Sequence, residues 1–116
     1  MKIRNTTRQT ILASRTELAD TVFSRLQGLL GRNSLPEQHA LIITQCRSIH
    51  MFFMRFAIDA VFVDRQHKVV GLVENLKPFQ MSPYFFRASY VIELPVGTIR
   101  ETRTSLHDTI EWVGEG

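Results

Sequence analysis

The sequence predicts an all-β (mainly β) domain, namely a β-sandwich or barrel-like antiparallel fold with one short α-helix. After Leu35-Pro36, short segments rich in β-branched and aromatic residues follow one another, and each is bounded by turn residues. Only one earlier segment has apolar residues at helical spacing. A chain of 116 residues with 44% hydrophobic residues is expected to fold as a single domain, residues 1–116, around one core.

Strands are expected along most of the chain. Residues 10–19 are interpreted as two short strands or a hairpin arm. Six further segments combine β-branched and aromatic residues with turn chemistry at their ends. They are residues 40–44, 48–54, 58–64, 68–74, 89–94 and 107–113. So many short strands favour a sandwich or a partly closed barrel, since these architectures protect strand edges.

One helix is predicted near the N-terminal third. Asp20 is a suitable N-cap, and Gly31 is a suitable C-terminal stop. Gly28 inside this short helix indicates close packing against a strand. The apolar residues that share one helical face are Val22, Leu26, Leu29 and Leu30.

Charge and cysteine content narrow the possible partners. The net charge is +3, and 11 of the 14 basic residues are arginine, which suits buried ion pairs or an anionic ligand. Basic residues are scattered among acidic ones along the chain and form no cluster, so the sequence argues against nucleic acid as a partner. A single cysteine, a polar N-terminus and no apolar run of about 20 residues indicate a cytoplasmic monomer without a membrane partner.

Nucleophilic and metal chemistry are both weakly indicated. Cys46 and His50 would lie about 13 Å apart in a strand, too far for proton transfer. We therefore expect Cys46 to be an unreactive packing residue. The four histidines show no paired ligand spacing, so neither a metal nor another cofactor is expected.

Charged residues inside apolar strands form the main candidate site. His50, Arg55, Asp59 and Glu93 are each flanked by apolar residues. Charged side chains are rarely buried without a partner, so Asp59 is expected to pair with Arg25 or Arg55. These residues are either structural ion pairs and the solvent face of a sheet, or a ligand pocket with convergent polar groups.

The segment 77–87 is an unusually aromatic connection with two prolines. We expect at least two of its rings to pack against strand residues such as Phe52 or Phe62, so that the loop plugs one end of the domain. The four rings concerned are Phe79, Tyr84, Phe85 and Phe86. A surface left outside would contact a partner through Phe79, Tyr84, Phe85 and Arg87.

A resemblance to a known family rests on several blocks taken in order. The central block is Cys46-Arg47-Ser48-Ile49-His50-Met51-Phe52-Phe53-Met54-Arg55-Phe56-Ala57-Ile58-Asp59, followed by 61–64, 76–79 and 91–97, with 19–20 and 25–30 upstream. From about residue 17 to residue 110 the chain resembles the family known as domain of unknown function 192. The resemblance implies a compact β-sandwich or barrel-like domain of bacteria and archaea without established activity. The family pattern has Gly-Asp before the last strand, whereas this chain has His107-Asp108.

Three functions therefore stay open. The leading hypothesis is a non-catalytic binding module for a small anionic or peptide ligand at His50, Arg55, Asp59 and Glu93. The second is an enzyme that uses His50 with Asp59 or Glu93 as acid and base. The third is a protein-interaction module that acts through the aromatic loop 79–86.

Overall fold

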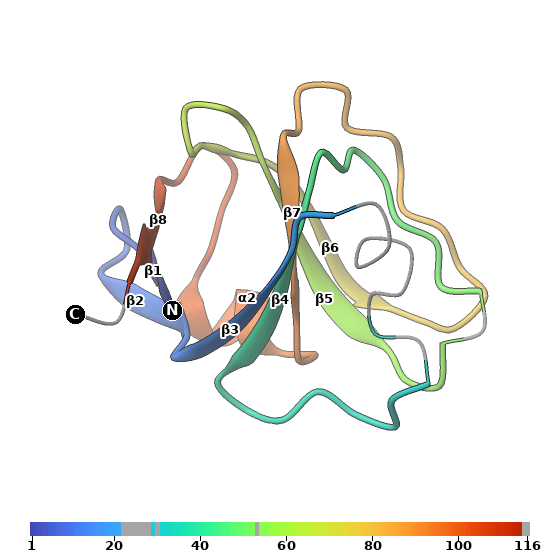
Figure 1. Cartoon of the computed structure of the whole chain (residues 1–116). Helices are drawn as coiled ribbons and strands as arrows, with labels where there is room; N and C mark the ends of the chain where they lie inside the picture. Colours follow the sequence, from blue (N-terminus) through green and yellow to red (C-terminus); the bar gives the residue numbers. More distant parts are fainter. Residues whose placement is uncertain (22–28, 30, 53, 115–116) are drawn as a thin grey trace.

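The computed structural model describes residues 1–21, 29, 31–52 and 54–114, and within them the chain forms two β-sheets. The large sheet has the strand order β3-β4-β7-β5-β6, and the small sheet has the order β2-β1-β8 (Figure 1). The strands of the large sheet are β3 (Arg15–Ala19), β4 (His39–Thr44), β5 (Ile58–Val63), β6 (Val69–Leu76) and β7 (Tyr90–Leu94). Those of the small sheet are β1 (Lys2–Asn5), β2 (Thr10–Ala13) and β8 (Ile110–Val113).

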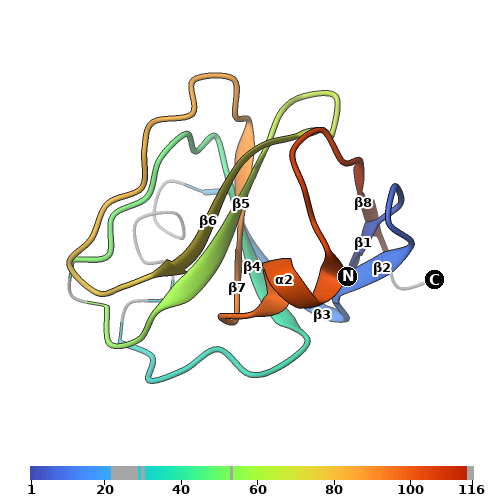
Figure 2. The same cartoon turned by 180° about the vertical axis from the view of Figure 1, so that it is seen from behind.

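The central strands β4, β5 and β7 of the large sheet are buried on both faces. One face packs on the small sheet, and the core between them includes Ile3, Leu12, Ile42, Val61, Ile92 and Ile110. The opposite face is covered by irregular segments that run alongside it, away from both chain termini (Figures 1 and 2). This second core includes Leu41, Phe62 and Val91 of the sheet and Ile49, Met51 and Met54 of the irregular segments.

The prediction of a mainly β domain is confirmed, and two sheets around a shared core are the arrangement of a sandwich. The segments 40–44, 58–64, 68–74 and 89–94 correspond closely to β4, β5, β6 and β7. Residues 10–19 form two strands, as expected, and the strand expected at 107–113 begins at Ile110. β3 and β4 pair in parallel, whereas the other strand pairs are antiparallel. A parallel pair requires a long connection between its strands, and residues 20–38 provide it.

The strand predicted at 48–54 is wrong. In this segment only an isolated bridge joins His50 to Met81. Burial alternates only over residues 49–52, because Met54, which a strand would place on the face opposite to Ile49 and Met51, is buried in the second core with them. A backbone that must direct these side chains inward cannot keep the pleat of a regular strand.

Two elements were not predicted from the sequence. β1 lies in the polar N-terminal segment, and the short helix α2 (Thr98–Thr102) follows the left-handed residue Gly97. The predicted helix over residues 20–31 falls mostly on 22–28 and 30, which lie outside the described residues. Within the part of the chain that the structure describes, no helix is long and apolar enough to cross a membrane.

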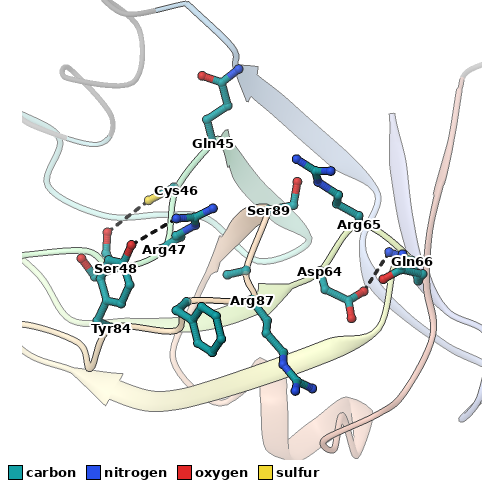
Figure 3. Close-up of a pocket in the computed structure, with 12 residues that line it drawn as sticks. Gln45, Cys46, Arg47, Ser48, Asp64, Arg65, Gln66, Tyr84, Arg87 and Ser89 are labelled. Carbon is teal, nitrogen blue, oxygen red and sulfur yellow. Dashed lines mark hydrogen bonds between the residues drawn. The ribbon is translucent and has the colours of Figure 1, made fainter.

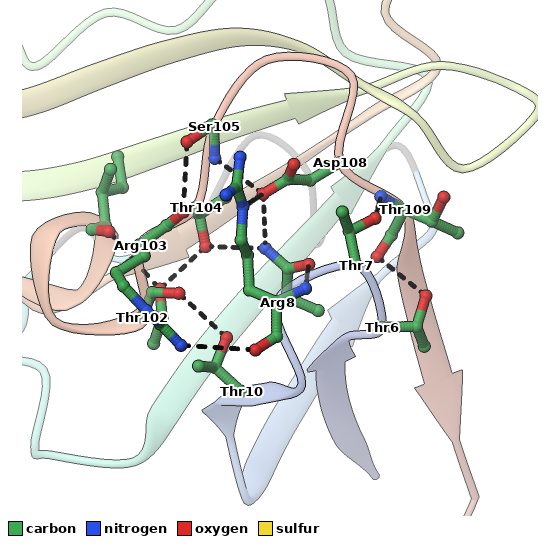
Figure 4. Close-up of polar contacts among 12 residues, drawn as sticks. Thr6, Thr7, Arg8, Thr10, Thr102, Arg103, Thr104, Ser105, Asp108 and Thr109 are labelled. Atoms are coloured by element: carbon green, nitrogen blue, oxygen red, sulfur yellow. Dashed lines mark hydrogen bonds and ion pairs between the residues drawn. The ribbon is translucent and has the colours of Figure 1, made fainter.

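A buried polar cluster ties the two chain ends together (Figure 4). The Asp108 Oδ2 atom accepts hydrogen bonds from Asn5 Nδ2 at 2.9 Å, from Arg8 Nε at 3.0 Å and from the Ser105 backbone at 2.9 Å. Burial alone would raise the pKa of Asp108, but these hydrogen bonds and the charge of Arg8 outweigh burial and lower it. The cluster therefore fixes the turn after β1 against the turn before β8.

The residue next to this cluster, His107, has a left-handed backbone with φ 74°. This is the position at which the family pattern has glycine. Side chains are disfavoured in this region because Cβ approaches the backbone, whereas glycine adopts it at little cost. The turn before β8 thus keeps a glycine-like shape in spite of the substitution.

Replacing His107 with glycine is expected to stabilise the domain by up to about 1 kcal/mol, because the strain of a left-handed side-chain residue is removed. Chemical denaturation should show a higher midpoint with an unchanged slope. His107→Ala is the matched control, since it removes the imidazole but keeps the strain. An equal gain in both variants would contradict the backbone explanation.

Candidate functional site

A groove of about 850 Å³ opens at one end of the large sheet (Figure 3). β4 ends at Thr44, β5 ends at Val63 and β7 begins at Tyr90, and the antiparallel registers place these three positions together. The chain segments that leave or enter these strands form the walls of the groove. Its characteristic lining residues are Arg47, Arg65, Arg87, Tyr84, Phe86 and Ser89.

The three arginines of the groove lack carboxylate partners. Within the described residues, the ion pairs connect other groups, and none involves Arg47, Arg65 or Arg87. Asp64 also lines the groove, but its Oδ1 atom accepts the backbone N–H groups of Gln66 and Lys68, each at 2.9 Å. That carboxylate therefore shapes its own turn, and the arginine charges are available to an anion.

The positive charges are spread along the groove. The Arg47 Nη1 atom donates a hydrogen bond to the Tyr84 hydroxyl at 3.3 Å. In Figure 3 the Arg65 side chain lies on the side of Ser89, while the Arg87 side chain extends in the opposite direction. Such a distribution suits an extended ligand with several negative charges better than a single compact anion.

Two aromatic rings stand exposed at the groove. Tyr84 is 64% exposed and Phe86 is 70% exposed, whereas Phe85 between them turns inward and packs on Phe62 with 4.5 Å between ring centroids. Gly71 permits this approach, because a Cβ atom there would lie 2.4 Å from the Phe85 ring.

The expectation that at least two rings of this loop pack inward is therefore wrong, since Phe79 is exposed as well. Residues 82–85 are irregular and Phe86 enters a turn, so the rings do not follow one another into the core, and only Phe85 packs on Phe62. The second core below is already filled by Ile49, Met51 and Met54.

A smaller aromatic pocket of about 280 Å³ adjoins the groove and shares Asp64, Arg65 and Ser89 with it. Its other walls include His67, Tyr90 and Trp112, and the Tyr90 and Trp112 rings meet edge to face at 4.7 Å. The Tyr90 hydroxyl lies 3.0 Å from His67 Nδ1. Burial raises the pKa of Tyr90, so this hydroxyl stays protonated at neutral pH.

The four residues predicted to form a ligand pocket are not brought together. His50 is exposed and stacks on Phe52 at 5.1 Å, and the Arg55 guanidinium donates to Asn33 Oδ1 at 3.1 Å. Asp59 pairs with Leu94 and Glu93 pairs with Ala60 in the same ladder, so the two carboxylates point to opposite faces of the sheet. The two carboxylates therefore cannot both act with His50 in one site, and the use of His50 with either of them remains a prediction.

Asp59 is fully buried, its partners among the described residues are backbone groups, and the expected pairing with Arg55 is not formed. Its Oδ1 atom accepts the Asn75 N–H at 2.9 Å, and its Oδ2 atom accepts the N–H groups of Gly97 at 3.1 Å and Ile99 at 3.0 Å. Arg55 is engaged elsewhere, and Arg25 lies outside the described residues. The carboxylate thus joins β5 to the end of β6 and to the start of α2.

Glu93 is buried on the face that carries the second core, between Leu41 and Ala60. Burial raises the pKa of Glu93 to about 7, and the positive charge of Arg32 opposes this only in part. Glu93 is therefore partly protonated near neutral pH. Its role in ligand binding remains a prediction, because no groove or pocket described here includes it.

Cys46 lies at the edge of the groove, half-buried against the second core, and its thiol donates a hydrogen bond to the Ser48 carbonyl at 3.1 Å. Its low reactivity remains a prediction. In the part of the chain that the structure covers, no group of three His, Cys, Asp or Glu side chains is placed to hold a metal ion.

A comparison with known protein families shows to which family this chain belongs. The model of DUF192, described as an uncharacterized ACR family, matches residues 3–112. This chain belongs to the DUF192 family. The resemblance seen in the sequence is thereby confirmed, and it extends further toward both termini.

Curated relatives of this DUF192 domain are also of unknown function. A UPF0127 protein of Thermococcus sibiricus is 34% identical over 112 residues, which covers 93% of this chain and 72% of that protein. A UPF0127 protein of Pyrococcus abyssi is 35% identical over 105 residues, with 85% and 86% covered.

Two solved structures resemble this domain. A protein of unknown function from Novosphingobium aromaticivorans has a TM-score of 0.82 at 21% identity and covers 96% of this chain and 82% of that one. A structure described as a putative transcription regulator from Sinorhizobium meliloti has a TM-score of 0.69 at 25% identity, with 83% and 79% covered. The first likeness shows a shared fold.

Sequence reasoning identified Tyr84 and Arg87 as candidate contacts but missed Arg47 and Arg65. One signal was present: residues 45–57 and 77–89 contain no acidic residue and four basic ones. The basic residues are Arg47, Arg55, Lys77 and Arg87. Arg65 could be added only from the strand order, which brings the turn after β5 beside these segments.

Replacing Asp59 with alanine is expected to lower the free energy of unfolding by roughly 3–5 kcal/mol, because three N–H groups, one buried and two part-buried, lose a charged acceptor. Urea denaturation measures this loss. Asp64→Ala is the matched control, because water can replace the Asp64 carboxylate in its exposed turn; a loss below about 1 kcal/mol is expected there. Equal effects of the two substitutions would refute the structural role of Asp59.

The raised pKa of Glu93 predicts a pH dependence of stability. The folded state holds a proton on Glu93 more tightly than the unfolded state, so stability is lost as pH rises from about 4.5 through about 7. The loss amounts to about 3 kcal/mol at most. Unfolding measured at pH 5 and pH 8 should show this decrease for the natural chain and not for Glu93→Gln; parallel pH profiles of the two chains would contradict it.

Proposed function

We propose that this DUF192 domain is a non-catalytic binding module for an extended anionic ligand, held in the arginine groove. One observation carries the proposal: three arginines that line a single groove have no carboxylate partner among the described residues. A guanidinium without a carboxylate partner can form charge-assisted hydrogen bonds with an anion that enters the groove.

The shape of the groove supports a ligand of more than one charged group. The arginine side chains leave from three different segments of the chain and do not meet at one point in Figure 3. Guanidinium groups bind carboxylate and phosphate oxygens through paired N–H donors, so both kinds of anion fit the chemistry. Phosphate-bearing chains and acidic peptides are the ligand classes that carry such charges in series.

The groove supports binding more than catalysis. Its walls supply positive charge, hydroxyl groups and aromatic surface. The residues that the sequence marks as acid–base candidates are outside these walls: His50 lies on the neighbouring loop, and Asp59 and Glu93 lie within the sheet. Binding without bond cleavage is therefore the function that the arrangement favours.

Inorganic tripolyphosphate provides a direct test, because it carries several negative charges and no other recognition element. Isothermal titration at low ionic strength should detect binding to the natural chain. The triple variant Arg47→Gln, Arg65→Gln, Arg87→Gln should bind at least about 10-fold more weakly, since each guanidinium contributes charge-assisted hydrogen bonds.

The control is a second triple variant with the same loss of charge elsewhere. Lys2→Gln, Arg15→Gln and Arg100→Gln remove three exposed cations that do not line the groove. This variant should bind tripolyphosphate within about two-fold of the natural chain. Equal losses in the two triple variants would show that only the net charge matters, and the proposed site would then be wrong.

A further inference from the structure

The geometry of the groove points to a specific ligand class: we infer that it binds single-stranded nucleic acid, with phosphates on the arginines and bases on the exposed rings. This inference rests on the proposed function and names its ligand. The sequence argued against nucleic acid because basic residues are scattered along the chain. The fold removes that objection, since Arg47, Arg65 and Arg87 come together in one groove.

Aromatic rings distinguish this ligand from other anions. Tyr84 and Phe86 lie in the groove with about two thirds of each side chain exposed. Large apolar side chains are costly to leave in water, whereas a base that stacks on them covers their faces. An acidic peptide or a free polyphosphate has no matching planar group, so neither accounts for the rings.

The order of charges and rings along the groove fits a flexible chain of nucleotides. Arg47 holds the Tyr84 hydroxyl at 3.3 Å, which places a guanidinium at the edge of the first ring. Arg87 directly follows Phe86 in the sequence. Phosphate contacts and stacking surfaces thus alternate, as in proteins that bind single strands without reading their sequence.

The smaller aromatic pocket offers room for one further base. It continues the groove past Arg65 and contains the rings of His67, Tyr90 and Trp112. Its volume of about 280 Å³ and these three rings, set among polar side chains, suit a flat heterocycle. A duplex cannot use such a pocket, because its bases are stacked inside the helix.

Apart from Asp64, whose carboxylate is bound by the backbone of its own turn, the charge of the surrounding surface is favourable. The paired segments 45–57 and 77–89, joined by the Phe85 N–H to Arg47 carbonyl bond at 2.8 Å, contain no acidic residue. A polyanion that leaves the groove along these segments meets Arg55 and Lys77 without a repelling carboxylate from them. This continuity extends the surface beyond the three groove arginines.

The test uses a fluorescein-labelled oligothymidylate of about 12 nucleotides, a length that spans a typical single-strand site. Fluorescence anisotropy should show binding that weakens with salt, with log K falling by about 2 for each tenfold rise in salt, since three phosphate contacts contribute about 0.7 each. Duplex DNA of the same length should bind at least about 10-fold more weakly.

Ring variants separate this inference from simple anion binding. The double variant Tyr84→Ala, Phe86→Ala should lose about 10-fold or more in affinity for the oligonucleotide and lose much less affinity for tripolyphosphate, which cannot stack on the rings. Tyr84→Phe should bind the oligonucleotide more tightly than Tyr84→Ala, because the ring is kept although its hydrogen bond with Arg47 is lost. Phe79→Ala is the matched control, since Phe79 is 68% exposed on the same loop but does not line the groove.

Three outcomes would overturn the inference. The first is tripolyphosphate binding without oligonucleotide binding, and the second is an unchanged oligonucleotide affinity in the double ring variant. The third is full competition by an equal concentration of an oligoglutamate peptide of the same charge. Each of these leaves the anion groove in place, whereas loss of tripolyphosphate binding alone would remove the proposed function itself.

Discussion

Burial of the central strands of the large sheet on both faces is the constraint on which the rest of the structure depends. Every residue of β5 and β7 is buried, so these two strands need a cover on each side. The small sheet provides one cover and joins the two chain ends, which the Asn5–Arg8–Asp108 cluster then holds together. The other cover comes from irregular segments whose apolar side chains fill the second core. Function is expected on this second cover, since irregular segments can present side chains outward while they pack inward.

Much of the fold can be predicted from local sequence patterns, and the elements that cannot be predicted depend on tertiary contacts. β4, β5, β6 and β7 are dense in β-branched residues and were predicted closely. The segment 48–54 is rich in apolar and aromatic residues but folds irregularly, because Ile49, Met51 and Met54 are all directed into the second core. β1 is a polar strand that exists through pairing with β2 and β8, and no local pattern reveals such tertiary support. α2 follows Gly97, which has a left-handed backbone. Asp59, on the distant strand β5, accepts hydrogen bonds from the backbone N–H groups of Gly97 and Ile99.

The candidate site was less predictable than the fold, for a physical reason. Asp59 and Glu93 attract attention in the sequence because they are charged residues among apolar neighbours, and both are indeed buried. Burial alone does not show whether a carboxylate stabilises the fold or contacts a ligand. Both oxygens of Asp59 accept hydrogen bonds from backbone N–H groups, which is the arrangement of a residue that stabilises the fold. The arginine groove, in contrast, is assembled from segments that are far apart in the chain. Only the strand order β4-β7-β5 brings Arg47, Arg65 and Arg87 to one end of the sheet.

The position of the groove also explains how irregular segments can hold a ligand surface in place. Each wall begins within a few residues of a strand end, so the sheet fixes the points from which the walls depart. The aromatic wall is anchored again in its middle, because Phe85 packs on Phe62 over Gly71. Tyr84 and Phe86, on either side of Phe85, are exposed. The contact of Phe85 with the core thus fixes the backbone from which both exposed rings project.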